Sequence, residues 1–135
     1  MAAAARTTAR DVARRRAVEL VFESLQRRQP ASVLLEGREA PPPYALTLVQ
    51  GVEAHQTEIT EWLDTYSHGW PSKRMPAVDR AILYVGAYEV VFEPDVPDQV
   101  ILKAAADLAA KLSTDKSPNF VSGLLGRISQ IKETL

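Results

Sequence analysis

The stretch PAVDRAILYVGAYEVVFEPDVP, residues 76–97, decides the fold class, because it predicts one helix that is apolar on nearly every side. It opens on a charged pair, Asp79 and Arg80, and it stops against Pro94 and Pro97. A helix that is apolar all round is buried by its neighbours. The stretch therefore predicts a central helix that other helices surround.

Helical periodicity also precedes this stretch. Apolar residues recur at i, i+3 and i+4 from Thr8 until Pro30, and again from Tyr44 to Tyr66. Gln56 interrupts the second stripe. Two helices are therefore expected before the central one, with a breaker-rich segment between them.

Two further helices are expected after the central one. One follows Val96, with Pro97 in its first turn. The other starts at Ser117, which can act as N-cap, with Pro118 at the first helical position. No period-2 alternation with hairpin turns supports strands. The prediction is an all-α bundle of five main helices, with one or two short extra turns.

Bulk composition favours an ordinary globular protein. The 135 residues suggest one domain, residues 1–135, with 46% hydrophobic and 24% charged residues. The net charge of -1 and pI near 6.1 argue against a strongly basic nucleic-acid binder, although a local basic patch remains compatible with binding. The absence of cysteine excludes disulfides and thiolate metal sites.

The sequence favours a soluble cytoplasmic protein. No apolar run approaches the roughly 20 residues that span a bilayer. Residues 1–16 have no apolar core after their charges, unlike a secretory signal. Their Arg-rich, acid-poor composition would suit a transit peptide in a eukaryote. The simpler interpretation is a frayed end that leads into a basic helix.

No residue pattern supports catalysis, a metal or a cofactor. His55 and His68 are too far apart for one helix face, and ordinary surface or loop histidines explain them. No Gly-rich phosphate loop follows a strand, and no nucleophile elbow is present. We therefore expect a protein that is not an enzyme.

The first helix is basic along one side. Arg6, Arg10 and Arg14 are spaced at i, i+4 and i+8, and Arg10 and Arg14 fall within about 60° of the centre of the apolar stripe. Because unpaired charges are not buried, we expect Arg10 and Arg14 at the lip of the bundle, beside the next helix. Guanidinium groups there would suit phosphate. A solvated helix end is the alternative.

Two aromatic residues are candidates for stacking on a base. Phe120 lies in the first turn of the last helix, where it can either complete the core or stack. Trp70 lies in the loop SHGWPSKRMP, residues 67–76, where it can stack or pack back onto the bundle.

The chain resembles the NusB family of bacterial transcription antitermination factors. The resemblance rests on four segments, in order: ARRRAVELVFESLQ (13–26), LTLVQGVEAHQTEITEWL (46–63), VDRAILYVGAYEVVFEPDVP (78–97) and VILKAAADLAAKLSTDKSPNFVSGLLGRI (100–128). The resemblance implies an all-α helical bundle of two three-helix sub-bundles. It also implies the partner NusE, a small-subunit ribosomal protein, the boxA RNA of ribosomal RNA transcripts, and the RNA polymerase antitermination complex.

The resemblance also implies residue roles. Arg10 and Arg14 match RNA-binding arginines, and Phe120 matches an aromatic that stacks on a base. Phe22 and Asp79 match positions that contact NusE. Asp79 could equally serve its own helix, because an acid in the first turn interacts well with the helix dipole.

The basic run departs from the family pattern. Asp11 and Val12 stand where family members often carry Arg or Lys, and the run is displaced to residues 14–16. Arg6 and Arg15 complete the expected RNA-binding set. Each lost phosphate contact lowers affinity and flattens its salt dependence. A possible homodimer, acting as a protein-interaction module with little RNA binding, is the alternative function.

Overall fold

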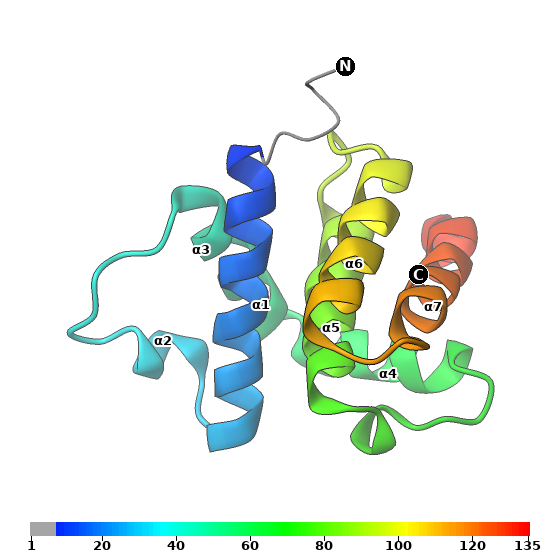
Figure 1. Cartoon of the computed structure of the whole chain (residues 1–135), viewed down its shortest axis with the longest axis horizontal. Coiled ribbons are helices and arrows are strands. Elements are labelled where there is room, and N and C mark those ends of the chain that lie inside the picture. The colour runs from blue at the N-terminus through cyan, green and yellow to red at the C-terminus, as the bar shows by residue number, and fades with distance from the viewer. Residues whose placement is uncertain (1–7) are drawn as a thin grey trace.

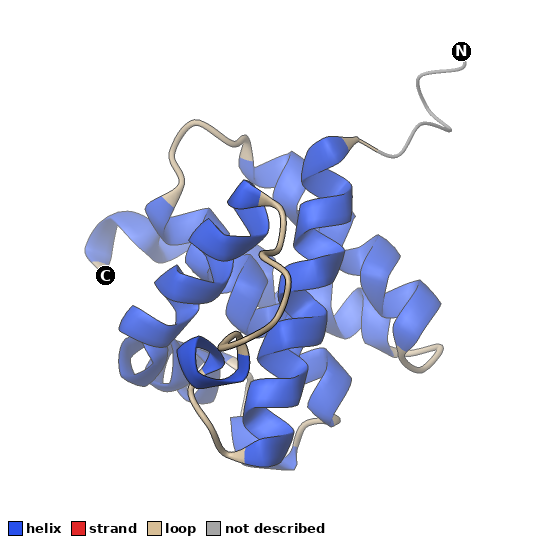
Figure 2. Ribbon diagram, turned by 90° about the vertical axis from the view of Figure 1, so that its left-hand side faces the viewer, coloured by secondary structure: helices blue, strands red, loops and turns tan. Residues whose placement is uncertain are grey.

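The computed structural model describes residues 8–135, and within these residues every regular element is helical (Figures 1 and 2). The all-α prediction is confirmed. The helices are α1 (Ala9–Arg27), α2 (Ala31–Leu34), α3 (Pro43–Ala54), α4 (Gln56–Tyr66), α5 (Ala77–Phe92), α6 (Asp98–Leu112) and α7 (Ser117–Ile131), with 3₁₀ turns at Ser72–Arg74 and Lys132–Thr134.

Helix α5 is the centre of the molecule. It contacts α1 and α3 on one side and α6 and α7 on the other, while α4 crosses beneath and touches both α5 and α7 (Figure 1). Every residue from Ala81 to Val90 is buried. The prediction of a surrounded central helix is confirmed, and the apolar composition of residues 81–92 is its cause.

The prediction of the second helix is wrong about its continuity. A single helix was expected from Tyr44 to Tyr66, but the chain turns at His55, which leaves helical geometry (φ -118, ψ 20) and separates α3 from α4. The imidazole of His55 stacks on Phe92 with ring centroids 4.1 Å apart. Val52 and Ile59 are buried on either side of the corner, so the apolar periodicity continues across the break.

Helix starts agree with the sequence in part. Thr8 is the N-cap of α1, and its hydroxyl accepts from the Asp11 N–H while the Asp11 carboxylate accepts from the Thr8 N–H. This reciprocal capping box fixes the first turn of α1. Pro97 precedes α6 as its N-cap rather than lying inside the first turn.

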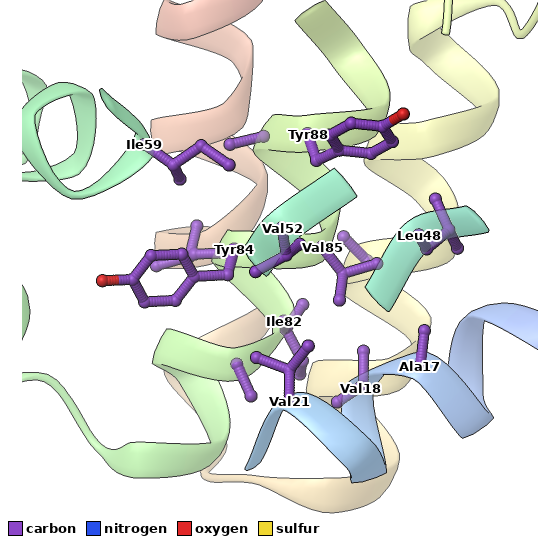
Figure 3. Close-up of a cluster of buried hydrophobic side chains, with 14 of the residues drawn as sticks. Ala17, Val18, Val21, Leu48, Val52, Ile59, Ile82, Tyr84, Val85 and Tyr88 are labelled. Carbon is purple, nitrogen blue, oxygen red and sulfur yellow. The ribbon is translucent and has the colours of Figure 1, made fainter. Parts of the chain in front are cut away.

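Helices α3 and α5 approach closely because residue 51 is glycine. A Cβ atom there would lie 2.2 Å from the Tyr88 ring of α5. The surrounding core holds Val52 and Leu48 of α3 against Val85 of α5 (Figure 3). The missing side chain is therefore a packing requirement, since protein interiors leave no room for the overlap.

We predict opposite effects of Gly→Ala at two helical positions. At Gly51 the clash with Tyr88 should outweigh the helix-propensity gain, since overpacking typically costs about 1–3 kcal/mol. At Gly123 of α7 the nearest atom to an added Cβ is 3.9 Å away, so Ala should stabilise by about 0.5–1 kcal/mol. Urea denaturation of both variants checks this. Equal shifts in the same direction would contradict the packing argument.

Candidate nucleic-acid interface

Arg10 is exposed on the first turns of α1 and lies against an aromatic ring of α3. Its Cζ atom is 4.4 Å from the centroid of the Tyr44 ring. This distance suits a cation–π contact, which limits the rotamers of the guanidinium without removing its hydrogen-bond donors. Arg10 therefore lies where the sequence predicted, at the edge of the bundle beside the next helix.

Arg14, one turn further along, is not at the lip, and that prediction is wrong. The residue is only 4% exposed. Its guanidinium binds Glu89 of α5, with Nε 2.9 Å from Oε1 and Nη2 2.7 Å from Oε2, and Nη1 lies 3.1 Å from Asp11 Oδ1. The donors of Arg14 that face protein are thus committed to carboxylates. Burial is tolerated because the charge is paired.

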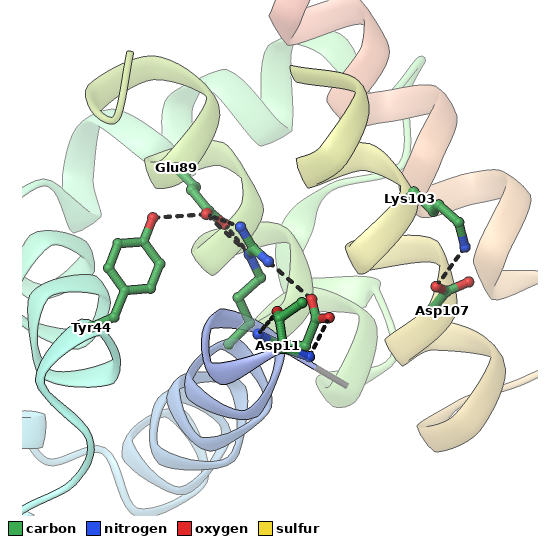
Figure 4. A network of polar contacts seen from close by, with 7 residues as sticks. Asp11, Tyr44, Glu89, Lys103 and Asp107 are labelled. Atoms are coloured by element: carbon green, nitrogen blue, oxygen red, sulfur yellow. Dashed lines mark hydrogen bonds and ion pairs between the residues drawn. The ribbon is translucent and has the colours of Figure 1, made fainter. Parts of the chain in front are cut away.

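Glu89 joins three helices. Its carboxylate, on a residue 1% exposed, accepts from Arg14 of α1 and from the Tyr44 hydroxyl of α3, with 2.8 Å between Tyr44 Oη and Oε2 (Figure 4). The guanidinium of Arg10 in turn lies over the Tyr44 ring. Burial and then the Glu89 hydrogen bond raise the pKa of Tyr44, so its hydroxyl stays a neutral donor.

Asp11 has a structural role that its sequence position did not reveal. It caps the start of α1 and pairs with Arg14. Although burial alone would raise the pKa of Asp11, hydrogen bonds from Thr8 and the charge of Arg14 leave that pKa below its usual value. The Asp11 carboxylate therefore stays ionised beside the predicted phosphate track, and it shares the single positive charge of Arg14 with Glu89.

The remaining predicted arginines differ in setting. Arg15 is exposed, and its Nε lies 3.6 Å from Glu19 Oε2, while Arg16 Nη1 lies 3.3 Å from Oε1 of the same residue. One carboxylate thus offsets part of this charge. Arg6 lies outside the described residues.

Phe120 is half-buried in the first turn of α7, so its predicted packing against the core is confirmed in part, and its stacking on a base stays a prediction. It packs against the core, and its ring centroid is 4.8 Å from that of Trp70 with the planes tilted by 53°. Trp70 has packed back onto the bundle through this contact, yet it remains 39% exposed. The start of α7 lies at the lower end of α6, away from the start of α1 (Figure 1).

Asp79 is buried, and its role in NusE binding stays a prediction. It is 2% exposed, and it accepts from the hydroxyls of Ser113 (2.5 Å to Oδ1) and Ser117 (2.9 Å to Oδ2). Ser117 is accordingly not the N-cap of α7; Lys116 holds that position, and the Ser117 side chain turns inward to Asp79. Asp79 therefore attaches the start of α7 to α5.

Phe22, the other predicted NusE-binding residue, is half-buried on α1 and packs against the core. Its ring is thus only partly available to another protein. The role of Phe22 in binding stays a prediction.

Sequence reasoning missed Glu89 and Tyr44. The available signal was that Glu89 is the sole charged residue in the apolar segment 81–92. A lone carboxylate in such a helix requires a buried cation or several donors. Matching it to Arg14, 75 residues away, needed the three-dimensional fold.

Among residues 8–135, no group of three or more His, Asp or Glu side chains could hold a metal ion. No helix in this described part of the chain is long and apolar enough to cross a membrane.

The fold and this arrangement define a class: an all-α bundle with a basic first helix fixed to a central apolar helix. The NusB family profile matches residues 11–130, and the chain belongs to the NusB family. The predicted resemblance is confirmed.

Individual relatives agree with this family. The chain is 51% identical over 132 residues to the transcription antitermination protein NusB of Kineococcus radiotolerans, covering 94% of this chain and 97% of the relative. It is 47% identical over 133 residues to the protein of that name from an Arthrobacter species, covering 95% and 98%.

Solved structures confirm the NusB fold. A structure of T. maritima NusB has a TM-score of 0.81 at 25% identity, covering 96% of this chain and all of that one. A chain from a crystal structure of antitermination factors NusB and NusE in complex with dsRNA has a TM-score of 0.79, covering 90% and 96%. At 23% identity, the second likeness concerns the fold alone.

We predict that Glu89→Gln destabilises the protein by on the order of 3 kcal/mol, because it leaves the Arg14 charge buried with only Asp11 as a charged partner. Lys103→Gln is the matched control. It removes the exposed i,i+4 pair with Asp107 (Figure 4) and should cost less than about 0.5 kcal/mol. Guanidinium denaturation measures both. Comparable small losses would show that the buried pair contributes no more than the surface pair.

For Asp79→Ala we expect a loss of about 1–3 kcal/mol, since the Ser113 and Ser117 hydroxyls lose their acceptor. Amide hydrogen exchange should become faster at the start of α7. Asp115→Ala, at an exposed position in the loop before α7, is the control. Unchanged stability and exchange in Asp79→Ala, combined with loss of NusE binding, would instead support the partner role that the sequence suggested.

Proposed function

We propose that this protein is a transcription antitermination factor that binds boxA RNA together with NusE and supports elongation by RNA polymerase. Family membership supports the function class, because the curated relatives are named transcription antitermination proteins. The observation in this structure that carries the RNA-binding part is Arg10, exposed and held over Tyr44 at the start of α1.

A guanidinium held in this way suits a phosphate of single-stranded RNA. It is weakly hydrated, always charged and able to donate two parallel hydrogen bonds. The Tyr44 hydroxyl is anchored on Glu89, so the ring under Arg10 has a fixed position. Less side-chain entropy is then lost when Arg10 binds, and Tyr44 is a positioning residue in the proposal.

The proposed RNA path runs from the start of α1 to the start of α7. Arg10 takes phosphate at one end, helped by Arg15 on the exposed side of the helix and by Arg6. Phe120, which is half-buried, stacks on a base at the other end. Because the two helix starts lie apart (Figure 1), an extended strand rather than a single nucleotide is the ligand.

The proposal assigns NusE to a separate surface that includes Phe22, and it makes Asp79 and Arg14 internal supports. The protein acts as a single domain that binds and positions its partners but catalyses no reaction. Since bacterial transcripts are made in the cytoplasm, the proposal places the protein there.

The test is binding of boxA RNA and of a scrambled RNA of the same length, each with and without NusE. We expect tighter binding of boxA RNA, with NusE increasing the difference. Equal binding to both RNAs that depends only on salt would refute the specific function. A stable dimer indifferent to RNA and NusE, seen by light scattering, would favour the homodimeric module instead.

We predict that Arg10→Gln weakens boxA RNA binding and reduces the slope of log K against log salt concentration by about 1, as expected for one lost phosphate contact. Its thermal stability should change little, because Arg10 is exposed. Arg14→Gln is the contrasting variant and should chiefly lower stability. Retained RNA affinity in a folded Arg10→Gln variant would remove Arg10 from the interface.

A further inference from the structure

Trp70 is an exposed aromatic side chain that the fold holds in place. It is one of the few large hydrophobic residues with more than a third of its surface exposed. Single exposed apolar residues are common and need no special explanation. Trp70 differs because its ring lies against Phe120, an aromatic with a proposed function, at a centroid distance of 4.8 Å.

The backbone before Trp70 is turned sharply towards α7. His68 and Gly69 both have positive φ, 56° and 85°, and a left-handed conformation is uncommon for a residue other than glycine. The Ser67 hydroxyl then donates to the Trp70 carbonyl at 2.6 Å. The loop therefore presents Trp70 in a defined position at the local expense of backbone strain.

Both flanks of the loop are fastened to the bundle. On one side, Arg127 Nε of α7 donates to the Tyr66 carbonyl at 2.8 Å. On the other, the Ser72 N–H donates to Asp64 Oδ1 at 2.6 Å. A rigid aromatic surface loses little entropy when a ligand stacks on it, which is an advantage in a recognition site.

The cationic residues that adjoin Trp70 and Phe120 in the sequence favour a polyanion. Lys116 is exposed one helical turn before Phe120, and Lys73 and Arg74 are exposed in the 3₁₀ turn that follows Trp70. Asp115 is the exposed acid adjoining Lys116. Asp64, the acid facing the loop, already accepts from a backbone N–H. Aromatic rings beside cationic groups form the usual combination for unpaired bases and their phosphates.

We propose that Trp70 and Phe120 together form a two-ring platform for unpaired RNA bases, with Trp70 contacting a base directly. The 53° tilt between the rings means that each ring takes its own base, so two nucleotides are splayed rather than stacked on each other. The platform rests on the proposed RNA-binding function and extends it from one aromatic residue to two. Lys116 is placed to contact the adjoining phosphate.

The variants separate stacking from charge. Trp70→Ala should weaken boxA RNA binding by roughly 5- to 150-fold with the salt slope unchanged, as for the loss of one stacked base. Trp70→Phe should keep most of the affinity. Lys116→Gln should flatten the salt slope. Trp62→Phe, at the other tryptophan of the chain, is the matched control and should bind as the unaltered protein does.

Fluorescence distinguishes direct contact from support of Phe120. In the Trp62→Phe background Trp70 is the single tryptophan, and stacking on a base should quench its emission when boxA RNA saturates the protein. When each base of the boxA RNA is replaced in turn by an abasic site, the quenching of Trp70 should be lost at one position of the RNA. Circular dichroism and thermal melts check that each variant is folded.

The outcomes are distinct. Weakened binding by folded Trp70→Ala together with quenching supports the platform. Normal binding by that variant, or lost binding without any quenching, overturns the direct contact while the proposed function stands, provided that Arg10→Gln still weakens binding. No preference of the unaltered protein for boxA RNA over the scrambled RNA overturns both proposals.

Discussion

The pairing of Glu89 with Arg14 is the interaction on which the basic end of the structure depends. Glu89 is the one charged side chain in the apolar centre of α5, and its isolated burial would cost several kcal/mol. Arg14 and the Tyr44 hydroxyl supply the compensating donors. Because they come from α1 and α3, satisfying one carboxylate fixes two helices against α5. Arg10, one turn before Arg14, acquires its exposed position over Tyr44 from the same arrangement.

Hydrophobic periodicity predicted most of the helices, because each of them buries an apolar face. The existence of α1, α5, α6 and α7 was predictable for that reason. The corner at His55 was not, since Val52 and Ile59 are both buried and a straight helix gives the same stripe. At this corner His55 stacks on Phe92, a residue distant in sequence, and periodicity does not reveal such a contact.

The sequence predicted the helix face on which each site residue lies, but it did not predict how deeply the residue is buried. Spacing correctly placed Arg10 and Arg14 on one side of α1. However, Arg10 is exposed to solvent, whereas Arg14 is buried with only 4% of its surface exposed. Helical phase alone cannot separate them, because the difference is the carboxylate that Arg14 meets on another helix. The burial of Asp79 was likewise not predictable from its position in the helix. A first-turn acid satisfies the helix dipole wherever it points, and only the positions of Ser113 and Ser117 show that it points inward.

The two acids of α5 explain why a central helix so apolar carries charge at all. Asp79 and Glu89 are ten residues apart, about 15 Å along the helix axis. Asp79 holds the start of α7 and hence Phe120; Glu89 holds the start of α1 and hence Arg10. Buried hydrogen bonds to carboxylates are directional, unlike apolar contacts, so they fix the orientation of a helix end as well as its proximity. In the proposed function α5 therefore sets the spacing between the phosphate-binding and base-stacking ends of the RNA path without touching the RNA.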